Sequence, residues 1–316
     1  MRMFAIALSA LAAFAANAQT YPDKPIRLVV PSPPVGSNDL IARLVGQQLS
    51  ARLGQQIVVD NRAGADGIVG AEFVARAPAD GYTLLLGNAT VNMANAYLHK
   101  RLPYDPVGDF TPIAGGFESI TCLALAGATP FRSVADLIDA AKRSPGKLTY
   151  GSSGSGGAYS IMGEVFKAVT RTDLTHVPYK GLAPAMTALL AGQIDATVTS
   201  VTVALPHHQS GKIRILALLD ERRYRGLNDV PTLREAVSDH DAFIIWNGFF
   251  GPAGMPPAIV RRLNAEIVRA MDAPEIREKL DAAEPIRLSP DEFATYVKAR
   301  SEAFARIVAL VGIKPQ

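Results

Sequence analysis

The chain has 316 residues, of which 48% are hydrophobic and 19% are charged. This composition supports a sizeable buried core and excludes a mainly disordered chain, while the length allows about two domains of roughly 150 residues. The net charge is +3. The longest basic run, Glu221–Arg225, is short, so the sequence shows no footprint of a nucleic-acid groove.

The first residues have the pattern of a secretory signal. Arg2 is followed by the uncharged apolar run Met3–Ala16 and then by the small residues Ala16-Asn17-Ala18. The run is shorter than the ~20 apolar residues of a membrane-spanning helix, which disfavours the alternative of an uncleaved anchor. We therefore predict a signal peptide over residues 1–18, cleavage before Gln19 and export to the periplasm.

Short apolar strands then alternate with longer helical patterns. The first series predicts strands at 26–30, 56–59 and 83–86, separated by helices at 38–53 and 67–77. The second predicts strands at 148–150, 176–179, 194–198 and 213–219, with helices at 134–142, 159–169 and 184–191. Two amphipathic helices, 257–271 and 290–310, close the chain. This βαβ order indicates parallel sheets with helices on their faces.

Two such series without a flexible linker predict two α/β lobes joined by strands that cross between them. We expect lobe 1 to comprise residues 20–122 and 222–316, and lobe 2 to comprise residues 123–221. The crossings are expected near Leu123–Ala126 and Leu216–Leu219.

Glycines and small polar residues follow several predicted strands at their carboxyl ends. These stretches are 31–38, 87–90, 151–157 and 199–200. Ligands of open α/β sheets bind at this edge, and the free N–H groups of helix starts favour anions. Ordinary N-capping, for example by Ser37 or Ser153, is the alternative for any one loop. Taken together, the loops of both lobes predict a shared anion site.

The common catalytic and metal-binding templates fit poorly. Gly151–Ser155 lacks the final glycine of a nucleophile elbow. The five histidines lack a zinc-binding spacing, and the adjacent His207 and His208 would diverge on a helix. The single cysteine, Cys122, lies in an apolar run, so we expect a buried hydrophobic residue and not a reactive thiol. We therefore predict no enzyme activity, no metal and no cofactor.

A series of motifs runs through essentially the whole mature chain. The motifs are Tyr21–Pro31, Asn61–Ala65, Asp80–Leu85, Leu102–Pro106, Val177–Gly181, Asp229–Thr232 and Phe250–Gly254. In this order they resemble the Bug proteins, which are the substrate-binding proteins of tripartite tricarboxylate transporters.

The resemblance implies a type II periplasmic-binding fold, in which two lobes with two crossing hinge strands close on a small carboxylate. It implies a monomer that delivers this ligand to the membrane permease subunits of a tripartite transporter. Loop N–H groups and hydroxyls of the family hold the carboxylate, partly through ordered waters. The candidate ligand-binding residues, from this mapping and from the strand ends, are Val35, Gly36, Ser37, Asn38, Thr90, Ser152, Ser153, Gly154, Ser155, Thr199 and Ser200.

The chain departs from the family pattern in these loops. Ser32 replaces an aromatic residue, and Val35 replaces a glycine, so that a Cβ restricts positive φ and is expected to narrow the cleft. Asp66 and Ile68 replace a usual glycine and a common asparagine. Thr199 stands where many relatives have aspartate and offers no charge to a ligand ammonium. We therefore expect carboxylates to bind better than amino acids.

Two other functions remain open at this point. The first is an exported sensory receptor of the same fold that acts on a signalling partner. The second is a secreted hydrolase that uses Ser153 or Ser155, which is disfavoured because the sequence places no histidine or acid to activate either serine.

Overall fold

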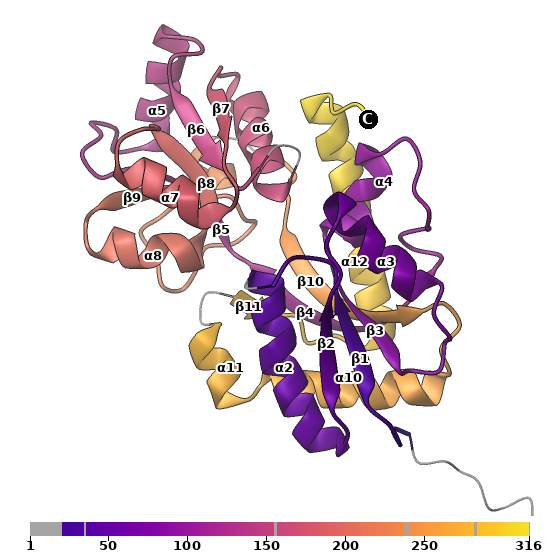
Figure 1. Ribbon diagram of the computed structural model, residues 1–316. Helices are drawn as coiled ribbons and strands as arrows, with labels where there is room; N and C mark the ends of the chain where they lie inside the picture. The colour runs from indigo at the N-terminus through magenta and orange to yellow at the C-terminus, as the bar shows by residue number, and fades with distance from the viewer. Residues whose placement is uncertain (1–20, 35, 155–156, 238–239, 281–282, 316) are drawn as a thin grey trace, which may run out of the picture.

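Two β-sheets, one in each lobe, organise the chain (Figure 1). The computed structural model describes residues 21–34, 36–154, 157–237, 240–280 and 283–315. The predicted signal peptide and the candidate residues Val35 and Ser155 lie outside these ranges. Among the described residues, no helix combines the length and apolar character needed to span a bilayer.

The larger sheet has the strand order β11-β4-β10-β3-β1-β2. β1 is parallel to β2 and β3, whereas β10 is antiparallel to β3 and β4. The strand bounds are β1 Ile26–Val30, β2 Ile57–Asn61, β3 Thr83–Asn88, β4 Phe110–Ser119, β10 Ile245–Pro252 and β11 Ala283–Pro285.

Helices cover both faces of this sheet because successive side chains of its strands point to opposite sides. Leu28 of β1 packs in one apolar cluster with α2 and α10, whereas Val29 packs in another with α3 and α12. The helical bounds of this lobe are α2 Ser37–Leu53, η2 Ala65–Gly67, α3 Ile68–Ala75, η3 Thr90–Ala94, α4 Asn95–Leu98, α10 Pro257–Met271, α11 Pro274–Lys279 and α12 Pro290–Val311. The short helix α9 (Leu233–Ala236) instead contacts elements of the second lobe.

The smaller sheet has the order β7-β6-β8-β5-β9 and repeats the same plan. β6 is parallel to β7 and β8, and β5 is the inserted antiparallel strand. Its strands are β5 Thr121–Ala126, β6 Thr149–Ser152, β7 Thr175–Pro178, β8 Ala196–Ser200 and β9 Ile213–Leu218. α7 (Leu182–Leu190) and α8 (Val201–Gln209) cover one face, and α5 (Val134–Arg143) and α6 (Ala158–Thr170) cover the other.

The first crossing precedes the stretch expected from the sequence, and the second begins at the last residue of its expected stretch, Leu219. The chain passes from β4 to β5 at Ile120 and returns between β9 and β10 over residues 219–244. Leu123–Ala126 and Leu216–Leu218 lie within β5 and β9, where apolar side chains fill the core of the second lobe. The N–H of Leu219 donates to the carbonyl of Thr121 (2.8 Å), which holds the crossings together. The lobe boundaries drawn from the sequence stay a prediction.

The predicted helices and strands are confirmed for the regular βα units, with bounds that differ by a few residues. α10 begins and ends where expected, and Ser133 caps α5 through a capping box with Asp136. Cys122 is fully buried in β5, as predicted, and burial raises the pKa of its thiol. The sequence patterns missed β4, β10 and β11.

Candidate functional site

The loop between β1 and α2 leads into a helix N-terminus that no side chain caps. Gly36 is the N-cap residue, in an extended conformation (φ −92°, ψ 172°), and its carbonyl accepts the first helical hydrogen bond, from Leu40 N–H at 3.0 Å. The N–H groups of Ser37 and Asn38 precede that bond and therefore have no acceptor within the helix. In Figure 1, α2 begins at the end of its lobe that faces the second lobe.

The loop between β6 and α6 has the same design. Gly157 is the N-cap of α6, again extended (φ −80°, ψ 172°) and without a side-chain cap, and its carbonyl accepts from Ser160 and Ile161. Gly154 has φ +147°, a conformation that L side chains rarely adopt. Ser153 is half-buried. These residues lead the chain from the sheet into a second helix start with free N–H groups.

Four other described helices, α5, α8, α9 and α12, close their N-termini with side chains, whereas α3, α4, α7, α10 and α11 have no side-chain cap. Ser133, Thr232 and Ser289 each accept a backbone N–H and complete a capping box. By contrast, a Cβ at Gly157 would meet nothing within 4 Å, and a Cβ at Gly36 would make only an ordinary contact of 3.7 Å. Neither glycine is therefore required for space, and both leave backbone N–H groups open to a ligand.

The other candidate residues are placed differently. Thr90 begins the π-helical turn η3, where the Asn88 side chain already accepts the N–H groups of Thr90 (2.9 Å) and Val91 (3.1 Å). Ser200 caps α8 by accepting from Val203 N–H at 3.4 Å. Thr199 is fully buried, and its hydroxyl has no hydrogen-bond partner among the residues that the structure describes. Thr199 and Ser200 are the last residues of β8, whereas the sequence placed the strand end before them.

A contact that the sequence did not predict lies behind the second loop. The hydroxyl oxygen of Ser152, which is fully buried, is 2.7 Å from His176 Nε2 and 2.8 Å from the carbonyl oxygen of Gly154. His176 stands on the neighbouring strand β7, 24 residues away in sequence. The sequence patterns predicted two short strands that end near these residues, but they gave no indication that the two strands pair with one another.

The arrangement of this pair differs from that of a catalytic serine triad. A catalytic serine needs a histidine base that an acid orients, but Glu164, the nearby acid, accepts from Tyr150 (2.6 Å) and Lys167 (3.1 Å). Ser152 directs its proton at a carbonyl and is closed to solvent. Among the described residues, no group of three His, Cys, Asp or Glu side chains is placed to hold a metal ion.

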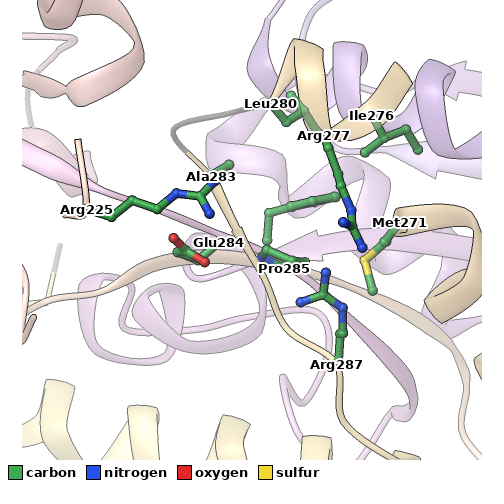
Figure 2. A pocket seen from close by; sticks show the side chains of 10 residues that line it. Arg225, Met271, Ile276, Arg277, Leu280, Ala283, Glu284, Pro285 and Arg287 are labelled. Atoms are coloured by element: carbon green, nitrogen blue, oxygen red, sulfur yellow. The ribbon is translucent and has the colours of Figure 1, made fainter. Parts of the chain in front are cut away.

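A separate hollow of about 220 Å³ lies in the first lobe, between α11 and β11 (Figure 2). Figure 2 shows the ends of Arg277 and Arg287 turned toward one another. Asp272 accepts from both guanidinium groups, at 3.1 and 2.7 Å. The positive charge of this hollow is therefore already partly neutralised, and the hollow does not include either glycine-capped helix start.

Comparison with known proteins identifies the family. A family model described as the tripartite tricarboxylate transporter family receptor matches residues 41–313. The protein BugT of Bordetella pertussis is 32% identical over 301 residues, which cover 94% of this chain and 92% of BugT.

Solved structures agree with this family and with the two-lobed fold. The R. palustris protein Rpa4515, solved with adipate, has a TM-score of 0.82 and 33% identity, covering 94% of this chain and 100% of that chain. MatC from Rhodopseudomonas palustris, solved with bound malate, has a TM-score of 0.77 and 30% identity, covering 92% and 100%. The periplasmic-binding fold expected from the sequence motifs is confirmed, and the chain belongs to the tripartite tricarboxylate transporter receptor family, whose members are solute-binding proteins.

Proposed function

We propose that this protein is a periplasmic receptor that captures a small dicarboxylate between its lobes and delivers it to the membrane subunits of a tripartite transporter. The observation that carries the proposal is the pair of glycine-capped helix starts, at Gly36 and Gly157, each at the carboxyl end of a parallel strand. The adipate and malate of the two related structures belong to the same ligand class.

The charge of the two loops favours an anion without an amino group. Residues 31–38 and 151–157 contain no Asp or Glu. The first acid after residues 31–38 in the sequence, Asp39, is buried in the first turn of α2 and accepts from Arg43 at 3.0 Å. The positive partial charge at each helix start would therefore repel a ligand ammonium, whereas it stabilises a bound anion by ~0.3–1 kcal/mol.

Binding closes the lobes by population shift. A ligand that contacts loops of both lobes gains its full set of hydrogen bonds only when they are close together, so binding favours the closed form. The receptor itself catalyses no reaction in this proposal. Delivery to a transporter is preferred to a sensory role because the family is that of transporter receptors.

Of the ligand-binding residues predicted from the sequence, Gly36, Ser37 and Asn38 in the first loop and Ser153 and Gly154 in the second are proposed to contact the ligand. Val35 and Ser155 lie outside the described residues, and Ser152 is proposed to support the second loop from behind. Thr90, Ser200 and the buried Thr199 are proposed to shape the surrounding strand ends. The lobe boundaries at 122/123 and 221/222 belong to the same proposal.

Calorimetric titration of the purified protein with malate, adipate, succinate and aspartate tests the function. We expect the dicarboxylates to bind and succinate to bind more tightly than aspartate, its aminated analogue. Tighter binding of aspartate, or no heat with any carboxylate, contradicts the proposal.

A single substitution tests whether the N-terminus of α6 binds the carboxylate. Gly157→Asp adds a capping carboxylate where the added Cβ meets no atom, so it should stabilise free α6 by a few tenths of a kcal/mol and repel the ligand. Ser289→Asp, at the N-cap of the remote α12, is the matched control and should leave binding unchanged. Equal affinity in both variants would show that the start of α6 does not bind the carboxylate.

A further inference from the structure

His176 is held in one orientation by its neighbours. Its ring stacks on Tyr150, its directly paired residue on β6, with ring centroids 4.8 Å apart and planes 20° apart. Tyr150 is itself fixed by donating to Glu164 of α6 at 2.6 Å. Ser152 lies two residues beyond Tyr150, on the same face of the strand, which brings its hydroxyl to His176.

The hydroxyl of Ser152 has one proton and two close oxygen or nitrogen neighbours. The carbonyl oxygen of Gly154, at 2.8 Å, can only accept, so the serine proton must point at it. The contact of 2.7 Å to His176 then requires a proton on the histidine side. His176 is therefore assigned as a donor through Nε2–H, with Nδ1 unprotonated in the neutral ring.

The surroundings favour the neutral ring. Burial lowers the pKa of His176, and Lys167 acts in the same direction, whereas Glu164 opposes both. Glu164 and Lys167 lie on α6 and form an ion pair in which Lys167 Nζ is 3.0 Å from Glu164 Oε2 and 3.1 Å from Oε1. A neutral imidazole offers one N–H only, so its single donor is used on Ser152.

The chain of hydrogen bonds runs from His176 to the turn that leads into the start of α6. His176 Nε2–H donates to Ser152, and Ser152 donates to Gly154, whose own N–H returns to the serine oxygen at 3.4 Å. Gly154 has φ +147°, a backbone conformation that glycine adopts more readily than other residues.

We propose that His176 is a positioning residue that sets the ligand-binding turn Ser152–Gly154 by donating from Nε2 to the Ser152 hydroxyl. The inference rests on the proposed function of that loop in carboxylate binding. His176 itself does not contact the ligand; it acts through Ser152. Without the donor, the serine hydroxyl can rotate away from Gly154, and the turn loses its fixed geometry.

Titration of His176→Ala and His176→Gln with malate and adipate tests the proposal. We expect His176→Ala to weaken binding on the order of tenfold, as for the loss of one buried hydrogen bond. The glutamine amide can donate to Ser152, so His176→Gln should restore most of the affinity. His208→Ala is the control. His208 lies on α8 of the same lobe, and its Nδ1 accepts a hydrogen bond from Ile215 N–H at 3.3 Å.

A spectroscopic measurement on His176 distinguishes a role in positioning Ser152 from a general contribution to the stability of the protein. Long-range ¹H–¹⁵N spectra of the wild-type protein should show the proton of His176 on Nε2. An Nδ1-protonated ring, unchanged affinity of His176→Ala, or an equal loss in His208→Ala would overturn the proposal. If wild-type protein binds neither carboxylate, the proposed function fails as well, whereas binding that is indifferent to His176 removes this inference alone.

Discussion

Asp220 is a buried acid at the point where the chain leaves β9 for the first lobe, and its replacement should stabilise the protein. The residue is 6% exposed. Its Oδ1 accepts from the backbone N–H groups of Glu221 (2.7 Å) and Arg222 (3.4 Å). Burial, with the nearby Glu118 carboxylate adding to it, raises the pKa of Asp220 from 3.8 to about 6, against the opposing hydrogen bonds and the Arg222 charge.

The size of this stabilisation follows from the thermodynamic linkage between proton binding at Asp220 and folding. Between about pH 4 and pH 6, the folded chain holds a proton on Asp220 that the unfolded chain has lost. Stability therefore falls as the pH rises through this window, and above pH 6 the full cost of the buried charge is present. At 1.36 kcal/mol for each pKa unit, a rise from 3.8 to about 6 corresponds to about 3 kcal/mol.

Asp220→Asn mimics the protonated acid and keeps an oxygen for the two N–H donors. We expect the free energy of unfolding to increase by up to about 3 kcal/mol at pH 7.5, which is roughly 5 °C in Tm for a chain of this size. At pH 4 the gain should nearly vanish, because the wild-type acid is then protonated in the folded state.

Urea unfolding at pH 4, 5, 6 and 7.5, followed by circular dichroism, measures the difference. Asp139→Asn is the matched control, because Asp139 is exposed on α5 and has no burial cost to remove. A gain of the same size at pH 4 and pH 7.5 would refute the reasoning. A loss at pH 7.5 would show that the attraction of Arg222 outweighs the burial of the charge.

Three further predictions follow from burial and sequence. Cys122 should resist iodoacetamide at pH 8 in the native protein and react in urea, because burial raises the pKa of its thiol; rapid native labelling would contradict this. Val35→Gly should change the ranking of ligands in a thermal-shift panel, since it removes a Cβ from the first loop; a lower Tm with an unchanged ranking would make Val35 purely structural. Exported protein should begin at Gln19 on N-terminal sequencing, and recovery of intact Met1 from the membrane fraction would refute the signal peptide.

Local sequence patterns predicted the regular parts of the fold because those depend on near neighbours. Apolar side chains spaced three or four residues apart define one face of a helix. Pro257 at the first turn of α10 and Ser133 before α5 mark helix starts through backbone chemistry alone. The glycine-rich loops after β1 and β6 could be found for a similar reason, since glycines after a parallel strand and before a helix leave N–H groups at a known edge of the sheet; their binding of a ligand stays a prediction.

The missed strands depend on partners far away in the sequence. β4 contains Gly115 and Gly116, which lower strand propensity, yet a Cβ at Gly116 would lie 2.1 Å from the side chain of Asn247 on β10. The glycine is there because two strands approach closely, and the sequence around it does not show which strand is opposite. Register across a sheet is a property of the assembled lobe.

The family motifs, the two βα series and the glycine-rich loops after β1 and β6 can be read from local patterns of residues. The folded chain was needed to show that His176 stands beside Ser152, that Asp220 is buried near Glu118, and that Ile120 marks the crossing. These facts arise from strand pairing and burial between residues 24 to 102 positions apart. Short-range patterns carry no information on such pairs, because the energy that selects them comes from surfaces that meet only after the chain has folded.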